Sequence, residues 1–170
     1  MILIAPFSND VLRNWPSRYF TELIQSLLDA YDDPIIMVGA AEQRQAINAM
    51  VRQFSSDRVS NVAGVWTWRE TVNCVGGAKL VIANNSGVAH LGANAGVATL
   101  CLFAASHDPF EWGPRGPRVT TVFTKPACAP CGMSGANGCT NGHVCMTDLR
   151  PGLVFAAARR MLGVPQSPST

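Results

Sequence analysis

Short apolar runs alternate with helical patterns along most of this chain. The apolar runs fall at residues 2–6, 34–40, 58–65, 79–83, 98–104 and 119–124. Apolar residues at helical spacing predict helices from Pro16 onward, after residue 40, and over 68–75, 87–94 and 151–162. Strands that are apolar on both faces and alternate with helices are typical of a parallel sheet covered on both sides. The pattern therefore predicts a doubly wound, Rossmann-like α/β domain.

The length of the chain predicts one domain with two irregular parts. At 170 residues, it is long enough for one well-buried domain and short for two. We place the domain at residues 1–162, with a cysteine-rich loop at 125–147 and a flexible tail at 163–170. A second loop, rich in Gly, Pro and Trp, separates the last two predicted strands.

The composition excludes several classes of protein. Hydrophobic residues make up 48% of the chain and charged residues 14%, which is typical of a globular core and not of a disordered chain. The net charge is +2 without a basic stripe, so we expect no nucleic-acid partner. No run approaches the ~18–20 apolar residues of a membrane span, and the first residues lack the basic flank of a signal peptide. We therefore expect a cytoplasmic protein.

Two polar connections of the predicted sheet are expected to face each other. Doubly wound sheets bind ligands beyond the carboxyl ends of their strands, where the strand order reverses. With the order 3-2-1-4-5-6, the reversal lies between the first and fourth strands. The loops that leave these strands contain Ser8 to Arg13 and Asn84 to Gly87. The two most polar connections of the chain would then converge on one crevice.

The stretch ANNSGVAHLGANAG at residues 83–96 is a candidate ligand site. Free N–H groups at the start of the following helix and the positive end of its dipole suit a phosphate, and Gly87 allows close approach. Ser86 adds a hydroxyl donor, while Arg13 and Ser8 supply donors from the opposite loop. The alternative is purely structural: Asn85 or Ser86 caps the helix, and Arg13 is a solvated surface charge.

Two further polar residues have two interpretations each. His90 lies nearly one helical turn beyond Gly87, and it either faces the same crevice or packs between helix and sheet. Glu42 follows the second strand, where it either binds a ribose hydroxyl or balances the helix dipole. The chain has no G-x-G-x-x-G after its first strand and no G-x-x-x-x-G-K-[ST]. The sequence therefore lacks the main motif that would indicate a dinucleotide-dependent dehydrogenase or a P-loop enzyme.

The six cysteines divide into two groups. Cys74 and Cys101 lie in apolar segments and are expected in the core. The other four crowd the cysteine-rich loop, at Cys128, Cys131, Cys139 and Cys145. Four thiolates at such spacing suit a tetrahedral structural zinc or iron site in a reducing compartment. The alternative is four reduced or paired thiols.

Two segments resemble the heptosyltransferases of lipopolysaccharide assembly, glycosyltransferase family 9. ILIAPFSNDVLRNWPSRYFTELIQSL resembles the opening of that family's C-terminal half, and KLVIANNSGVAHLGANAGVATLCLF resembles its Asp-Ser/Thr-Gly-x-x-His segment. The matching positions are Ser8, Arg13, Trp15 and Pro16 in the first segment, and Asn85, Ser86, Gly87 and His90 in the second. The Cys-x-x-Cys pair followed by Cys145-Met146 and a helix is also similar to the family.

The resemblance implies a glycosyltransferase, and within it the donor-binding, C-terminal half of a two-domain GT-B fold. Family members transfer a sugar, usually heptose from ADP-heptose, with inversion to a lipopolysaccharide-type or other glycan acceptor, and this transfer requires no cofactor. Arg13 and the helix start at Ser86–Gly87 would hold the pyrophosphate and stabilise the leaving nucleotide. Asn85 and His90 would contact the sugar or phosphate, and Glu42 the nucleoside or sugar.

The chain also departs from this family. Asn85 stands where the family commonly has Asp, which removes a charged contact. The N-terminal acceptor half, which carries the family's general base, is not in this sequence, so we expect weak donor binding and little transfer by the chain alone. Related autotransporter heptosyltransferases carry a four-cysteine iron finger, which supports a metal by analogy. The resemblance extends the expected location to the inner face of the inner membrane.

Two other functions compete with a transferase. Asn85 and the missing base favour a non-catalytic nucleotide-binding or interaction module built on the same fold. The cysteine-rich loop, together with Trp112 and Arg115, favours more weakly a metal-finger protein that binds a partner through residues 105–145. Titration with a nucleotide separates this last function from the other two.

Overall fold

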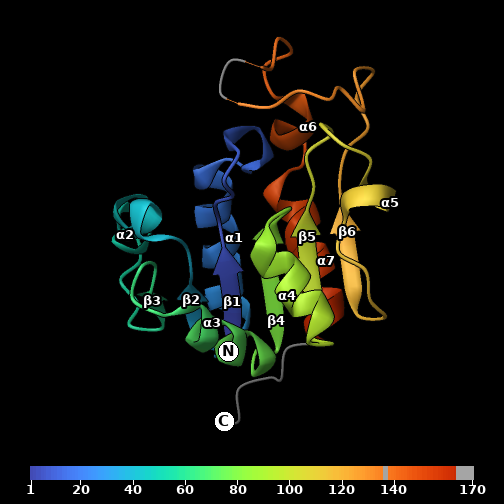
Figure 1. The fold of residues 1–170 in the computed structure, drawn as a ribbon. Helices are drawn as coiled ribbons and strands as arrows, with labels where there is room; N and C mark the ends of the chain where they lie inside the picture. Colours follow the sequence, from blue (N-terminus) through green and yellow to red (C-terminus); the bar gives the residue numbers. More distant parts are fainter. Residues whose placement is uncertain (136–137, 164–170) are drawn as a thin grey trace.

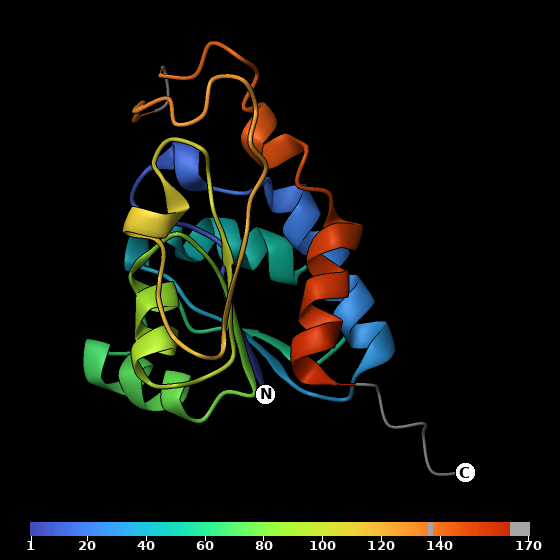
Figure 2. The ribbon, with the colours of Figure 1, turned by 90° about the vertical axis from the view of Figure 1, so that its right-hand side faces the viewer.

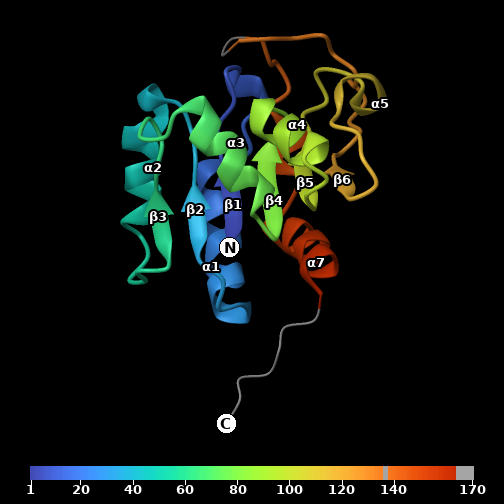
Figure 3. The same ribbon diagram turned by 60° about the horizontal axis from the view of Figure 1, so that its bottom comes forward.

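Six parallel strands form one sheet in the computed structural model, which describes residues 1–135 and 138–163. The strands are β1 (Ile2–Ala5), β2 (Ile35–Met37), β3 (Val59–Asn61), β4 (Leu80–Asn84), β5 (Thr99–Leu102) and β6 (Val119–Val122). Their order is β3-β2-β1-β4-β5-β6, as Figures 1 and 3 show. The predicted doubly wound sheet, with its reversal between β1 and β4, is confirmed.

Helices connect the strands, and the long ones match the predicted segments. They are α1 (Ser17–Ala30), α2 (Arg44–Val51), α3 (Trp68–Gly76), α4 (Gly87–Asn94), α5 (Pro109–Trp112), α6 (Val144–Thr147) and α7 (Pro151–Leu162), with the 3-10 turns η1 (Val11–Arg13) and η2 (Ala41–Gln43). The sequence predicted loops where α5 and α6 occur, because a helix of one turn leaves no periodic pattern.

The two faces of the sheet are covered by different helices. Ile2 and Ile4 of β1 belong to the core shared with α1, α2 and α7, whereas Leu3 and Ala5 belong to the core shared with α3 and α4. Figure 2 shows α1 and α7 on one side of the sheet and α3 and α4 on the other. This placement follows from the alternation of side chains along a strand whose two faces are both buried.

A small residue brings α4 close to the sheet. A Cβ on Gly92 would overlap the Thr99 hydroxyl oxygen and lie 3.3 Å from Val81 Cβ, so the helix can pack here only without a side chain. The start of α4 is thereby fixed at the carboxyl edge, beside the ends of β1 and β4.

The C-terminal part of the domain ends with α7, which packs against α1. Only Gly163 of the predicted tail at 163–170 is described, and residues 164–170 lie outside the described part of the chain. Among the helices that the structure describes, none has the length and apolar character needed to cross a membrane.

Candidate functional site

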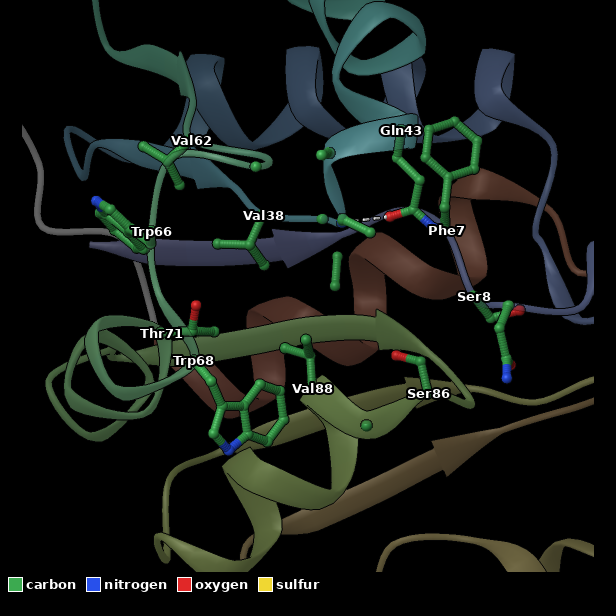
Figure 4. A pocket seen from close by; sticks show the side chains of 17 residues that line it. Phe7, Ser8, Val38, Gln43, Val62, Trp66, Trp68, Thr71, Ser86 and Val88 are labelled. Carbon is green, nitrogen blue, oxygen red and sulfur yellow. Dashed lines mark hydrogen bonds between the residues drawn. The ribbon is translucent and has the colours of Figure 1, made fainter.

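A cavity of about 550 Å³ lies at the carboxyl edge of the sheet, between the loops that follow β1, β2, β3 and β4. Its lining has a polar part and an apolar part. Ser8, Asn9, Gln43 and Ser86 supply polar side chains, and the apolar side chains include Val38, Val62, Trp66 and Trp68. Figure 4 shows Ser8 and Ser86 at one end, with Val62 and Trp66 at the other. The cavity occupies the place where doubly wound sheets bind ligands.

A buried asparagine joins the two polar loops. Asn84 is fully buried at the end of β4, where its Oδ1 accepts from the Trp15 N–H at 3.0 Å. Its Nδ2 donates to the Pro6 carbonyl oxygen at 2.6 Å. The Trp15 indole in turn donates to the Leu149 carbonyl at 2.6 Å. The first of the two asparagines in the motif is therefore a structural clamp that fixes the β1 loop beside the β4 loop.

Arg13 bridges the same two loops from its position at the end of η1. One terminal nitrogen donates to the Asn85 carbonyl oxygen at 3.4 Å, and the other donates to Asn9 Oδ1. Its Nε is buried and has no partner. Arg13 does not line the cavity itself, but its partner Asn9 does. The prediction that the Arg13 turn lies beside the start of α4 is confirmed, and Arg13 is more than a solvated surface charge.

Ser86 precedes α4 but does not cap it through its side chain. The first hydrogen bonds of the helix run from the N–H groups of Ala89 and His90 to the Ser86 carbonyl oxygen. The N–H groups of Gly87 and Val88 therefore have no acceptor inside the helix. Within residues 1–135 and 138–163, Ser86 Oγ and Arg13 Nε are the two buried side-chain polar atoms that have no hydrogen-bond partner. Such atoms are rare in folded proteins and call for a ligand or water.

Ser8 lines the cavity, but its polar groups serve the β1 loop. Its backbone N–H donates to Asn14 Oδ1 at 2.7 Å, and its hydroxyl lies 2.7 Å from the Asp10 carbonyl oxygen. Asn85 is also buried, and its backbone N–H donates to the Leu102 carbonyl at 3.0 Å. Both residues hold the walls of the site in place.

Comparison with known proteins identifies the family of this domain. Residues 1–138 match the sequence model of "Glycosyltransferase family 9 (heptosyltransferase)". This match covers most of the chain. The chain belongs to glycosyltransferase family 9.

The individual proteins to which this chain is similar are heptosyltransferases as well. Lipooligosaccharide heptosyltransferase 2 of Campylobacter jejuni is 24% identical over 153 residues, which is 88% of this chain and 47% of the relative. The structure of E. coli ADP-heptose lps heptosyltransferase II has a TM-score of 0.80 and 20% identity, over 95% of this chain and 46% of that one. For E. coli heptosyltransferase WaaC with ADP, the TM-score is 0.73 and the identity is 17%, over 94% of this chain and 43% of that one. The chain spans about half the length of these relatives, and its fold is that of one half of a GT-B enzyme.

Of the seven residues predicted for the site of this family 9 domain, Ser8, Ser86 and Gly87 line the cavity, whereas Arg13, Asn85, Glu42 and His90 do not. Glu42 is exposed and does not line the cavity, because η2 turns the next residue, Gln43, toward it. The Gln43 side chain accepts from the Ala40 N–H at 3.0 Å. His90 is exposed on α4 and does not line the cavity either, so it does not pack between helix and sheet. The sequence pattern did not single out Gln43, since helical spacing does not register a 3-10 turn.

The predicted four-cysteine metal site finds no support in the structure. Burial raises the pKa of the Cys145 thiol, the Ala105 N–H lowers it, and the nearby thiols of Cys139, Cys131 and Cys128 raise it further. The thiols are thus neighbours, and all described cysteines are free. In the described residues, however, no three His, Cys, Asp or Glu side chains are grouped so that they could hold a metal ion. The zinc or iron prediction is therefore unsupported by the described residues.

Proposed function

We propose that residues 1–162 bind the nucleotide-sugar donor of a family 9 glycosyltransferase through its pyrophosphate. The observation that carries the proposal is the pair of buried, unpartnered donors, Arg13 Nε and Ser86 Oγ, on the two loops that meet at the start of α4. The free N–H groups of Gly87 and Val88 add donors and the positive end of the helix dipole. All of these groups favour an anion.

The donor we propose is ADP-heptose or a close analogue. Solved relatives include E. coli heptosyltransferase WaaC with ADP and the same enzyme with ADP-2-deoxy-2-fluoro heptose. Gln43 and the apolar part of the cavity would then face the nucleoside. The acceptor would be a lipopolysaccharide-type or other glycan hydroxyl, and the transfer would invert the anomeric centre.

The chain's own residues would act on the leaving group. As the bond between the sugar and the diphosphate breaks, negative charge grows on the phosphate oxygen that leaves. Arg13 and the N–H groups of Gly87 and Val88 would stabilise that charge more than the ground state. The N–H groups at the start of α4 would need no rearrangement for this electrostatic catalysis, whereas Arg13 would turn its guanidinium from Asn9 and Asn85 toward the phosphate.

The remaining half of the reaction would come from another domain. The chain spans about half the length of its relatives, and the general base that deprotonates the acceptor would belong to the other half. We therefore expect the chain to bind the donor and to transfer little sugar alone, at a cytoplasmic location or at the inner face of the membrane.

Titration with pyrophosphate and ADP tests the proposal. We expect saturable binding of both by calorimetry. Arg13→Ala should weaken both ligands by about 1.5–3 kcal/mol, because a hydrogen bond to a charged group is lost. That loss is about 10- to 150-fold in Kd. The matched control is Arg52→Ala, since Arg52 is exposed at the end of α2 and does not line the cavity.

The controls separate binding from folding. Urea unfolding of each variant shows whether Arg13→Ala also loosens the loops that Arg13 joins. Unchanged pyrophosphate affinity in a folded Arg13→Ala variant, or no binding by the natural sequence, would refute the proposed anion site.

A further inference from the structure

Two tryptophans that the sequence pattern did not single out line the cavity. Trp66 is partly buried and packs against the core under α3 and α4. Trp68, the first residue of α3, lines the cavity although 64% of its surface is exposed. An exposed indole that lines a cavity can bury its free face only when something occupies the cavity.

Trp68 lies beside the candidate anion site. A Cβ placed on Gly87 would be 3.9 Å from Trp68 Cη2, so the indole edge reaches the first turn of α4. In Figure 4 the ring of Trp68 extends toward Val88, on the side of the cavity opposite Gln43. In a ligand whose phosphates lie at Ser86 and Gly87, the groups bonded to those phosphates would therefore lie close to this indole.

The backbone beneath Trp68 is held in place before any ligand arrives. Thr67 Oγ1 accepts from the Glu70 N–H at 3.3 Å, and Glu70 Oε2 accepts from the Thr67 N–H at 2.7 Å. The bond from the Thr67 backbone lowers the pKa of the Glu70 carboxyl. This reciprocal cap fixes the start of α3. Preorganised contacts lose less entropy on binding, so a ring that stacks here gains more affinity.

The chemistry of the wall favours a flat aromatic ring. Val38, Val62 and Trp66 continue the apolar surface beyond Trp68, and none of the lining residues carries a charge. A hexose or heptose would need polar partners for its hydroxyl groups along this surface, where Figure 4 shows Thr71 as the labelled polar side chain beside Trp68. A nucleobase presents two apolar faces and stacks on indole without such partners.

We propose that Trp68 is a specificity-determining residue that stacks on the base of the donor nucleotide. This inference rests on the proposed function, because it requires phosphates at the start of α4. It adds that the affinity for a nucleotide divides into two separable parts, one at Arg13 and one at Trp68. Inorganic pyrophosphate lacks a base and reports only the first part.

The experiment compares two ligands across a small set of variants of the full chain. Kd values for pyrophosphate and ADP are measured by calorimetry for Trp68→Ala, Trp68→Phe and Trp112→Ala. Trp112 is the matched control, because it is 59% exposed on α5 and does not line the cavity. We expect Trp68→Ala to weaken ADP about tenfold, as for other base–aromatic stacks, and to change pyrophosphate less than twofold. Trp68→Phe should restore most of the ADP affinity.

The outcomes distinguish this inference from the proposed function. If Arg13→Ala weakens both ligands but Trp68→Ala leaves ADP unchanged, the anion site stands and the stacking role of Trp68 is refuted. If Trp68→Ala weakens both ligands equally, Trp68 shapes the helix start and does not select the base, which also refutes it. If the natural sequence binds neither ligand, the inference and the proposed function both fail.

Discussion

The cavity lies at the carboxyl edge of the sheet, and Figure 1 shows the described parts of the cysteine-rich loop beyond the same edge. The two regions are held in different ways. The loops around the cavity leave strands of the sheet and are joined by the fully buried Asn84. The cysteine-rich loop is attached to η1 by groups nearer the surface. Its Gly135 N–H donates to Asp10 Oδ1 at 3.1 Å, and His143 Nε2 donates to the Leu12 carbonyl oxygen at 2.6 Å.

The difference shows what each region contributes to the candidate site. No described residue of the cysteine-rich loop lines the cavity. The loop reaches the site through η1, because Asp10 Oδ1 also accepts from the Leu12 N–H at 3.0 Å and Arg13 ends the same turn. The sheet therefore places the groups that we propose to bind the donor, and the loop supports the turn that carries Arg13.

The largest effect should follow from breaking the clamp between the two loops of the cavity. Asn84→Ala leaves the Trp15 N–H and the Pro6 carbonyl buried without partners. Each such loss is expensive, and we expect the free energy of unfolding to fall by about 2–5 kcal/mol. Urea unfolding measures it. Asn73→Ala is the control, since Asn73 is exposed on α3, and its stability should change by less than about 0.5 kcal/mol. Equal stability of the two variants would show that the clamp does not hold the loops.

A slightly smaller effect should follow from moving α4 off the sheet. Gly92→Ala forces the new Cβ against Thr99 and Val81, so we expect a loss of about 1–3 kcal/mol from overpacking. Gly76→Ala is the matched control, because no atom lies within 4 Å of a Cβ placed at Gly76 in α3. Thermal unfolding and pyrophosphate titration of both variants give the result. A Gly92→Ala variant as stable as the control would mean that the close packing of α4 can relax.

The sequence predicted those parts of the molecule that a repeating pattern determines. The apolar runs predicted the strands of a parallel sheet, and the strand order assumed for a doubly wound sheet, which the structure has, brought the Arg13 and Ser86 loops together at one edge. The roles of Asn84 and Gln43 were missed, because each depends on a single side-chain direction that no periodicity encodes. The spacing of the four cysteines indicated their proximity but not the positions of their sulfur atoms.

Removing the attachment of the cysteine-rich loop should have a modest effect. His143→Ala loses the bond to the Leu12 carbonyl, and we expect a loss of stability of about 0.5–1.5 kcal/mol. Thr140→Ala, at an exposed position of the same loop, should change stability by less than about 0.5 kcal/mol. Urea unfolding compares the two. A loss as large as that of Asn84→Ala would overturn the view that the loop only supports η1.

The smallest effect is a difference in reactivity between a thiol in the sheet and a thiol in the cysteine-rich loop. It can be measured without any substitution. Burial in β5 raises the pKa of Cys101 from 9.0 to about 12, whereas Cys131 is exposed in the loop. Only the thiolate reacts, so iodoacetamide at pH 8 should modify Cys131 and reach Cys101 only after unfolding in urea, as mass spectrometry can show. Because folding raises this pKa, the stability linked to the protonated thiol is fully present below pH 9. It is lost as the pH rises toward 12. Labelling of Cys101 in the folded protein as fast as Cys131 would show that β5 opens to solvent.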